Sequence, residues 1–432
     1  MMISGWGRTK QFKSNILKPK DNNELRYLVK NHKKIITRGL GRSYGFSSIS
    51  DNVVDLSFFL EKKFKINKNK NILECHSSYS LKDIIDRLLK KGLFIPVTSG
   101  TKFVTIGGAI ASDIHGKNHH IDGSFCDYVS SLKLMLANGK VIHCSKSKNS
   151  KIFYSTCGGM GLTGIILEAR IKLIKIPSEN ILETIIKTKN LNQTFENFER
   201  YNNYKYIVAW IDTNKKNECL GRSVIYLGKH SNDKKNYFNN LSLKLPFEFP
   251  SFFLNKVLLK ILSSLYYFLS PSKKTRIVDL RNYFYPLDKI HNWNLAYGKK
   301  GFVQIQILIN EKNLKENLKE IILFFKKNNQ VSFLSTLKKM GKRNNNLLSF
   351  PEKGYTITFD LQNNSKLNKF YIALEKKLKK IGAKQYLTKD NLMTRSFFKQ
   401  NNKKLKQFIR IKKKLDPNNK FQSYQSTRLK IY

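Results

Sequence analysis

Glycine-rich segments in the amino-terminal half constrain this chain more than any other feature of its sequence. One spans residues 37–45, a second spans residues 99–116, and a shorter one follows at residues 158–164. Glycine permits positive φ and lets the main chain approach a ligand without a Cβ atom in the way. Successive backbone N–H groups in such turns, with the positive end of a following helix, attract phosphate. The two longer segments therefore predict a bound cofactor that carries a diphosphate.

The glycine spacing excludes two common nucleotide-binding motifs. The first segment places glycines at 39, 41 and 45, which does not match the G-x-G-x-x-G spacing of a Rossmann fold. Lys117 is followed by Asn118, where a P-loop requires Ser or Thr, and no glycine stands five residues before Gly116. The cofactor site must therefore have another architecture.

Hydrophobic periodicity predicts mixed secondary structure along the chain. Helices are expected at residues 20–31 and 81–91, and short strands at residues 35–36, 53–56, 72–75 and 94–97. Strands at residues 128–136 and 141–144 flank an Asn-Gly turn, and another strand covers residues 164–173. Beyond Pro177, strand-like runs at residues 206–212, 302–309 and 355–361 alternate with lysine-rich amphipathic helices. This pattern favours an α+β second domain.

The chain is strongly basic, with 80 Lys and Arg against 30 Asp and Glu and a formal net charge of +50. Clustered cations favour nucleic acid through counterion release, but these lysines are spread over most of the chain. No helix-turn-helix, zinc-finger or RNA-binding signature accompanies them. Abundant asparagine and isoleucine indicate compositional drift, and attraction to an anionic membrane or lipid phosphate is the alternative. We therefore expect no nucleic-acid partner.

Cysteine usage and the amino terminus bear on the cellular compartment. The five cysteines form no C-x-x-C pair, and their odd number argues against a disulfide framework. The first residues contain no apolar stretch typical of a signal peptide. These features predict a cytoplasmic location, with a peripheral position at the inner face of the plasma membrane as a further option.

Residues 245–269 form an apolar, aromatic-rich segment interrupted by Lys256 and Lys260. These lysines, with Ser263 or Ser264, make one polar stripe on an otherwise apolar helix. The segment is too interrupted to span a bilayer, which requires about 20 mostly apolar residues. It is expected either to lie in the interface of a membrane or to pack on the core of the protein itself.

Further motifs extend over nearly the whole chain, in an order typical of one flavoprotein family. They are Asp113-Ile114-His115-Gly116-Lys117-Asn118, Tyr285-Pro286-Leu287-Asp288, Trp293-Asn294-x-x-Tyr297-Gly298, Gly301-Phe302-x-Gln304-x-Gln306, Ser349-Phe350-Pro351, residues 354–360, Tyr386-x-x-Lys389-Asp390, Asp416-Pro417 and Arg428-Leu429. The ordered set resembles the decaprenylphosphoryl-β-D-ribose 2-oxidase family, which belongs to the vanillyl-alcohol-oxidase superfamily of FAD-linked oxidoreductases.

The resemblance implies a two-domain α+β fold. Residues 1–176 would form a PCMH-type FAD-binding domain, and residues 177–400 a substrate domain built on an antiparallel sheet. Residues 401–432 would return to the FAD-binding domain. Because Arg42 stands where relatives with covalently attached flavin have histidine, the FAD is expected to be non-covalent.

The activity that the resemblance implies is oxidation of the 2-hydroxyl of a polyprenylphosphoryl pentose to the 2-keto sugar. A separate short-chain reductase would then complete a 2-epimerisation, so the expected partners are a lipid-linked sugar phosphate and that reductase. Two alternatives stay open, namely a soluble sugar-alcohol or aldonolactone oxidase and a non-catalytic flavin-fold scaffold that binds membranes or polyanions. Lys389 and His115 favour an enzyme over a scaffold.

Cofactor-binding residues are predicted from the glycine-rich segments and from their match to the family. They are Arg38, Gly39, Leu40, Gly41, Arg42, Ser43, Tyr44, Ser99, Gly100, Thr101, Thr105, Gly107, Gly108, Ala111, Ser112, His115, Gly116, Asn118, Gly159, Gly161, Gly164 and Ile165. Tight turns in an ordinary packed fold are the alternative for these glycines.

By resemblance, Lys389, His115 and Tyr386 are the catalytic candidates. An ammonium near the flavin would stabilise negative charge that develops on the reduced ring, which is the role expected of Lys389. The sugar pocket would be lined by Tyr44, Gln304, Gln306, Lys338, Thr356, Thr358 and Lys389. Gln304 and Gln306 alternate along a strand, so both amides are expected on one face. Thr358 stands where mycobacterial relatives have cysteine, and Thr356 replaces an asparagine.

Three histidines and an aspartate in the second glycine-rich region also suggest a metal site. Imidazole and carboxylate groups are common ligands, and His115, His119, His120 and Asp113 lie close in sequence. Their position inside the flavin-binding region favours flavin or substrate contacts for His115 and structural roles for His119 and His120. No metal is therefore expected.

Overall fold

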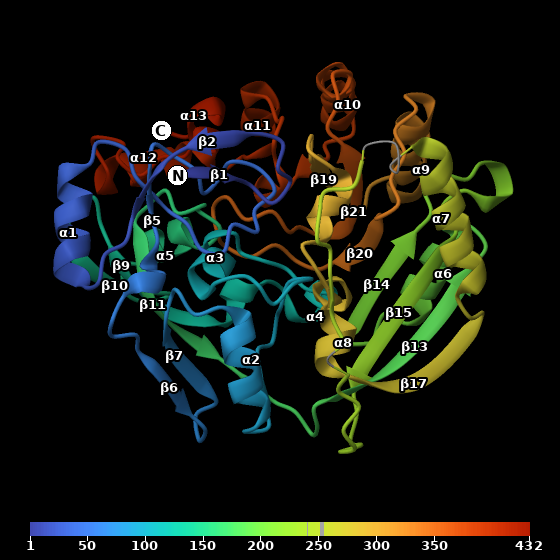
Figure 1. The fold of residues 1–432 in the computed structure, drawn as a ribbon, viewed down its shortest axis with the longest axis horizontal. Coiled ribbons are helices and arrows are strands. Elements are labelled where there is room, and N and C mark those ends of the chain that lie inside the picture. Colours follow the sequence, from blue (N-terminus) through green and yellow to red (C-terminus); the bar gives the residue numbers. More distant parts are fainter. Residues whose placement is uncertain (240, 251–254) are drawn as a thin grey trace.

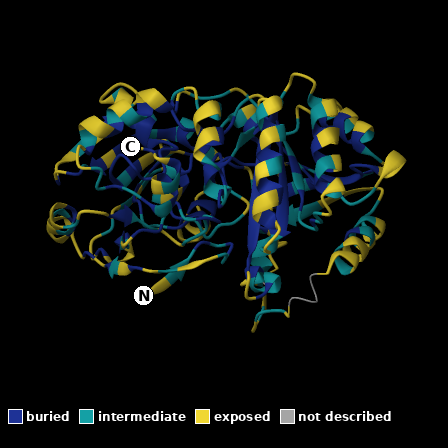
Figure 2. Cartoon of the chain, turned by 90° about the horizontal axis from the view of Figure 1, so that it is seen from above, coloured by how far each residue is buried: buried dark blue, intermediate teal, exposed yellow. Residues whose placement is uncertain are grey.

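Two regions lie side by side in the computed structural model, which describes residues 1–239, 241–250 and 255–432 (Figure 1). One region holds the amino-terminal and carboxy-terminal elements, and the other is built on a large sheet. Buried residues concentrate in the strands, and the helices of both regions carry exposed residues on their outer sides (Figure 2). The fold is α+β, as the sequence predicts.

The first region contains two main sheets. A parallel sheet has the order β3 (Asn15–Leu17), β5 (Asn52–Val54), β4 (Ile36–Thr37). An antiparallel sheet has the order β10 (Val141–Ser145), β9 (Val129–Met135), β11 (Ile165–Lys172), β7 (Ile72–His76), β6 (Phe64–Asn67). Its β9–β10 hairpin turns at Gly139, whose φ of +79° suits glycine. The predicted hairpin is confirmed.

Helices of this region begin at the capping residues that the sequence offers. Asp21 accepts backbone N–H groups at the start of α1 (Asn22–Asn31), and Ser80 forms a capping box for α2 (Leu81–Leu89). The strand expected at residues 94–97 lies instead at β8 (Leu93–Phe94), paired with β12 (Ile174–Lys175). The smaller elements are β1 (Met2–Ser4), β2 (Gln11–Lys13), α3 (Ile106–Ala111), α4 (His119–Asp122) and α5 (Ser150–Thr156).

The second region is an antiparallel eight-stranded sheet. Its order is β17 (Lys273–Asp279), β13 (Asn180–Thr188), β15 (Ser223–His230), β14 (Tyr206–Ile211), β20 (Thr336–Met340), β21 (Gly354–Gln362), β19 (Phe302–Asn310), β22 (Lys384–Gln385). Apolar residues of α6 (Leu191–Arg200), α9 (Leu314–Lys327) and α10 (Leu367–Lys380) form one core with a face of this sheet. On β19, Ile305 and Ile307 belong to that core, so the intervening Gln304 and Gln306 point to the opposite face.

Two further helices and a short strand pair complete this region. They are α7 (Lys256–Leu269), α8 (Leu280–Phe284), and β16 (Leu243–Lys244) paired with β18 (Ile290–His291). Residues 251–254, within the predicted amphipathic segment, lie outside the described residues. Among the helices of the described ranges, none is long and apolar enough to cross a membrane.

The carboxy-terminal helices α11 (Arg395–Asn401), α12 (Leu405–Leu415) and α13 (Tyr424–Leu429) lie over the first region (Figure 1). Phe421 pairs in parallel with Ile35 and belongs to the same apolar core as α1. The Lys412 Nζ atom lies 2.9 Å from an Asp416 carboxylate oxygen, and the Asp416 side chain also accepts the Phe421 N–H. These contacts fix the last segment beside the first glycine-rich turn.

Candidate functional site

A cavity of about 990 Å³ brings the glycine-rich segments and the open face of the large sheet together. This volume is at the upper end of the range usual for ligand pockets. Its wall includes most of the predicted site residues: Arg38, Gly39, Leu40, Gly41, Arg42, Ser43, Tyr44, Ser99, Gly100, Thr101, Thr105, Gly107, Gly108, Ala111, Ser112, His115, Gly116, Gly161, Gly164, Gln304, Gln306, Lys338, Thr358, Tyr386 and Lys389. The sequence therefore located this wall from segments far apart in the chain.

The first glycine-rich turn is held by Arg38. Its guanidinium donates to the Ser4 carbonyl at 2.7 Å, and the chain folds over it at Gly41, which has a φ of +64°. A Cβ atom on Gly41 would lie 2.3 Å from an Arg38 nitrogen. The backbone conformation therefore favours glycine here, and a side chain would also displace the Arg38 guanidinium.

The second segment touches the first directly. A Cβ atom on Gly39 would lie 2.3 Å from Thr105 Oγ1, and the same hydroxyl accepts the Gly108 N–H at the start of α3. Gly100, by contrast, has no heavy atom within 4 Å of its Cβ position, because it borders open space in the cavity. The two segments are thus close enough to bind one diphosphate.

Polar atoms left without partners in the wall support a bound cofactor. Arg42 Nε and Thr388 Oγ1 are buried and have no hydrogen-bond partner among the described residues. Buried polar groups are usually satisfied, and such exceptions indicate a missing ligand or water. With the bare backbone of the two turns, these residues fit a diphosphate cofactor with a polar ring system.

A buried network connects His115 to the sheet. Gln306 Nε2 lies 3.0 Å from His115 Nε2 and 3.1 Å from Thr356 Oγ1, and Thr356 donates its hydroxyl hydrogen to the Ile307 carbonyl. Because the Thr356 oxygen can then only accept from Gln306, the amide nitrogen also donates to His115 Nε2. The imidazole proton is therefore on Nδ1, which faces the Lys338 amine at 3.5 Å.

Electrostatics keep this imidazole neutral. Burial lowers the pKa of His115 well below 6.5, and the nearby Lys338, His119 and Lys389 lower it further. Burial also lowers the pKa of Lys338 to about 8. A neutral His115 whose Nε2 accepts from Gln306 fixes the orientation of that amide and is not free to accept another proton at that nitrogen.

Lys389 lies at the end of the 3₁₀ helix Leu387–Lys389. Its ammonium lies 3.7 Å from the centroid of the Tyr44 ring, a favourable arrangement for a cation. Burial lowers its pKa, attraction to Asp360 raises it, and repulsion from Lys338 lowers it. Burial likewise raises the pKa of Asp360, whose carboxylate accepts the Gln304 amide at 2.5 Å. Lys389 and Asp360 therefore influence the protonation of each other, and Gln304 is hydrogen bonded to the Asp360 carboxylate.

Tyr386 is positioned by contacts on both sides of its ring. Its hydroxyl donates to the Ser112 carbonyl at 2.9 Å, and the ring stacks on Phe350 with a centroid distance of 4.9 Å. Burial raises its pKa above the ordinary tyrosine value. Tyr386 therefore stays protonated and holds the start of the segment that carries Lys389.

Four predicted site residues do not line the cavity. Asn118 is buried and donates to the Pro96 carbonyl, and Thr356 lies behind Gln306. Gly159 is in the tight turn after α5, where a Cβ atom would lie 2.0 Å from the Ser155 carbonyl oxygen, and Ile165 packs in the core beside α1. Each lies within two residues of a wall residue in the sequence but does not itself line the cavity.

An aromatic end of the cavity was missed by sequence reasoning. Trp210, Tyr226, Tyr266 and Phe333 line it, and they come from β14, β15, α7 and a loop. The Trp210 and Tyr266 rings meet edge to face at 4.7 Å. No local motif connects these residues, so only the folded chain reveals that they share a wall.

The Asp113 and histidine cluster serves the packing of the fold. Asp113 accepts hydrogen bonds from Asn344, Asn346 and Ser349, and His119 accepts the Gly341 N–H. In the described ranges, no group of three or more His, Cys, Asp or Glu side chains is placed to hold a metal ion.

Comparison with known proteins identifies the family. A family profile described as FAD binding domain matches residues 16–145, and one described as D-arabinono-1,4-lactone oxidase matches residues 356–429. A decaprenylphosphoryl-beta-D-ribose oxidase of Mycolicibacterium smegmatis is 32% identical over 449 residues, covering 99% of this chain and 97% of that protein. The chain belongs to the decaprenylphosphoryl-beta-D-ribose oxidase family. It is an FAD-dependent oxidoreductase.

More distant relatives share only part of the chain. Mouse L-gulonolactone oxidase is 27% identical over 172 residues, which covers 39% of this chain and 38% of that protein. Arabidopsis thaliana cytokinin dehydrogenase 2 is 26% identical over 145 residues, covering 33% of this chain and 29% of that protein. The resemblance to these enzymes is thus confined to about a third of the oxidase.

The bound FAD is expected to separate from the protein on denaturation. Arg42 stands in the position where covalent relatives have histidine, and its guanidinium lies 3.9 Å from the Trp6 ring centroid. A protonated guanidinium is a poor nucleophile and forms no stable bond to the flavin. Acid precipitation of the yellow enzyme should leave the flavin absorbance in the supernatant, whereas a yellow pellet would contradict this expectation.

Proposed function

We propose that this oxidase converts the 2-hydroxyl of a polyprenylphosphoryl pentose, ribose or a close analogue, into a 2-keto sugar. The observation that carries the proposal is that three kinds of group line one cavity, which we treat as three zones. Glycine-rich backbone forms the first zone, buried amides and lysines form the second, and aromatic side chains form the third. These zones suit a flavin, a sugar phosphate and a prenyl chain respectively.

The polar zone has the groups that a sugar alcohol requires. Gln304 and Gln306 point from β19 into the cavity, and Asp360 and Thr356 of the neighbouring strand β21 hold their amides from the side. Lys389 supplies positive charge to this buried site, and Lys338, whose amine faces the His115 Nδ1–H, adds charge only in its protonated form. Such fixed donors bind hydroxyl and phosphate oxygens without reorganisation during the reaction.

FAD, when bound, would accept the hydride from the sugar carbon, and the hydroxyl proton would pass to water in the cavity. The protein positions the sugar hydroxyl through Gln304 and Gln306. The Lys389 ammonium, held over Tyr44, stabilises negative charge where it develops. We assign the electrostatic role to Lys389 and the positioning role to His115, which stays neutral.

A second enzyme would complete the conversion. A 2-keto sugar can be reduced from the opposite face, which yields the 2-epimer of the starting pentose. We propose a separate short-chain reductase for that step. The relative in M. smegmatis supports the first half-reaction by its name, and the pairing rests on the chemistry of the product.

The competing activity is oxidation of a soluble sugar alcohol or aldonolactone, which the lactone-oxidase profile over residues 356–429 favours. An anaerobic flavin spectrum separates the two. We expect polyprenylphosphoryl ribose to bleach the flavin, with free ribose, xylitol and an aldonolactone leaving it oxidised. Bleaching by the soluble compounds alone would establish the competing activity.

Adding a short-chain reductase and its nicotinamide cofactor should yield the 2-epimer, and recovery of only the starting sugar would reject the pairing.

A further inference from the structure

Helix α7 carries its apolar residues outward. Its most exposed side chains include Val257 at 66%, Ile261 at 55%, Leu265 at 51% and Phe268 at 69%. Ser263 is fully buried on the opposite side. Lys256, Lys260 and Ser263 share one side of this continuous helix, as the spacing predicts, but their exposure differs, because the two lysines are exposed and Ser263 is buried. A surface helix normally shows the reverse arrangement.

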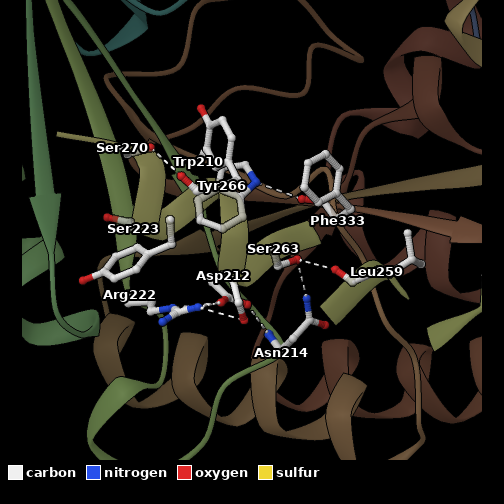
Figure 3. Close-up of polar contacts among 12 residues, drawn as sticks. Trp210, Asp212, Asn214, Arg222, Ser223, Leu259, Ser263, Tyr266, Ser270 and Phe333 are labelled. Carbon is white, nitrogen blue, oxygen red and sulfur yellow. Dashed lines mark hydrogen bonds and ion pairs between the residues drawn. The ribbon is translucent and has the colours of Figure 1, made fainter. Parts of the chain in front are cut away.

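Polar contacts hold the inner face of α7 in this orientation (Figure 3). Asn214 Nδ2 donates to Ser263 Oγ at 3.1 Å, and the Tyr226 and Tyr266 hydroxyls are hydrogen bonded. Lys187 donates to the Ser270 carbonyl at 2.7 Å, just beyond the end of the helix. Rotating α7 to bury its apolar face would break these bonds, so the exposed face is built into the fold.

The inner network is itself anchored in the sheet. Arg222 lies 2.9 Å from a carboxylate oxygen of Asp212, and both side chains are almost fully buried. Arg222 also donates to Ser264 of α7, and Asn214 donates to the Ser332 carbonyl. Leaving such buried polar groups unpaired is costly, which makes this packing specific.

Cations border the exposed apolar face. Lys256 and Lys260 are exposed on α7, and repulsion from Lys216 and Lys260 contributes to a lowered pKa of Lys326. Lys216, Lys260 and Lys326 therefore lie near one another. Within the described part of the chain, no ion pair to a carboxylate is formed by Lys256, Lys260 or Lys216. An apolar face bordered by free lysines is complementary to lipid chains beneath anionic headgroups.

The same helix borders the substrate cavity. Tyr266 on the inner face of α7 lines the aromatic end together with Trp210, Tyr226 and Phe333. A lipid-linked substrate would therefore enter the cavity close to a helix whose other side is apolar. This continuity connects the exposed face with substrate supply.

We propose that the outer face of α7 docks on the surface of an anionic lipid bilayer. Val257, Ile261, Leu265 and Phe268 enter the interface, and Lys256 and Lys260 contact the headgroups. The proposal rests on the lipid-linked substrate of the proposed function. A second copy of the chain is a poorer occupant, because each chain carries a formal net charge of +50 and two copies would repel each other.

Flotation of the FAD-loaded, full-length protein with vesicles tests the docking surface. Vesicles of phosphatidylcholine with phosphatidylglycerol should float the protein, and those of phosphatidylcholine alone should float less. The double variant Ile261→Glu and Phe268→Glu should lower the partition coefficient between water and vesicles at least tenfold. The reason is that it removes two apolar side chains that the bilayer would bury. Ile372→Glu, at a site on α10 that is 53% exposed, is the matched control and should leave flotation unchanged.

A second variant tests the charge complementarity. Lys256→Ala with Lys260→Ala should lower binding to anionic vesicles roughly fivefold for each lysine and leave neutral vesicles unaffected. Absence of flotation by the wild-type protein, or equal flotation of the Ile261→Glu and Phe268→Glu variant, would overturn the proposal. Concentration-dependent dimers abolished by that variant, without vesicle binding, would assign the face to a second copy.

Flavin bleaching by a short-prenyl, detergent-soluble substrate distinguishes failure of the docking from failure of the proposed function. The α7 variants should bleach at the wild-type rate, because none of the exchanged residues lines the cavity. Bleaching without vesicle binding would reject the docking alone. Vesicle binding without bleaching would reject the substrate and leave the docking in place.

Discussion

Replacing Lys389 with methionine is expected to lower the rate constant for flavin reduction by about 10³-fold. The substitution removes the ammonium that lies over Tyr44 and leaves the buried Asp360 carboxylate without its cationic partner. Both changes disfavour negative charge in the wall. Stopped-flow absorbance of the flavin under anaerobic conditions measures the effect directly, with the FAD content of the variant checked from its spectrum.

Arginine at position 389 separates the effect of the positive charge from the effect of its loss at high pH. Lysine with a lowered pKa loses its proton below the ordinary lysine value of 10.5, so the ammonium is present at low pH and lost as pH rises. The rate of flavin reduction should therefore fall toward alkaline pH in the wild type. Lys389→Arg keeps its charge throughout, so it should show no such fall and a rate loss of only about tenfold.

The control is an exposed lysine on a neighbouring element. Lys399→Met on α11 changes the same side chain outside the cavity wall and should leave the rate and the pH profile unchanged. If Lys389→Met reduces its flavin within a factor of two of the wild type, Lys389 has no electrostatic role. If the rate of flavin reduction by Lys389→Arg still falls toward alkaline pH as in the wild type, the group that titrates is Lys338 or another residue.

Local chemistry made the cofactor side of this site predictable from the sequence. The turn at Gly41 needs positive φ, and the contact of Gly39 with Thr105 needs a missing Cβ, so glycine marks both positions in the sequence. Alternation along β19 likewise placed Gln304 and Gln306 on one face. In each case the information lies within a few residues of the site.

The orientation of α7 could not be predicted in the same way. Amphipathicity assigns the apolar side of a helix to the core by default. Here the neighbouring sheet offers Asn214, Arg222 and Tyr226, all at least 30 residues earlier in the chain, as partners for the polar side. The aromatic end of the cavity escaped prediction for the same reason, because its residues meet only in the folded protein.

Replacing Gly45 with alanine is expected to lower the free energy of unfolding by about 3 kcal/mol and to weaken FAD binding. A Cβ atom here would lie 1.8 Å from the Asp390 carbonyl oxygen, a backbone atom that no side-chain rotation can move away. Relief requires displacement of the first glycine-rich turn or of the segment that carries Lys389. Thermal unfolding and a titration of the apoprotein with FAD measure the two effects.

The displacement would affect both the first glycine-rich turn and the segment that carries Lys389. Tyr44 donates its N–H to the Thr388 carbonyl at 3.0 Å, so the turn and the Lys389 segment move together. Asp390 is in turn fixed by Gln425 at 2.8 Å and by Arg428, which ties the carboxy-terminal helix α13 to the same point. Flavin affinity and the rate of flavin reduction should therefore fall in parallel in Gly45→Ala.

Gly100 provides the matched control within the same cavity. Its Cβ position has no neighbour within 4 Å, so Gly100→Ala should change the unfolding free energy of the apoprotein by less than about 0.5 kcal/mol. Any loss of FAD affinity in that variant then reports contact with the cofactor and not damage to the fold. Equal free energies of unfolding for Gly45→Ala and Gly100→Ala would show that the backbone at Gly45 and Asp390 can move apart with little loss of stability. In that case, the position of the Lys389 ammonium would not depend on the close packing of the first turn against the Lys389 segment.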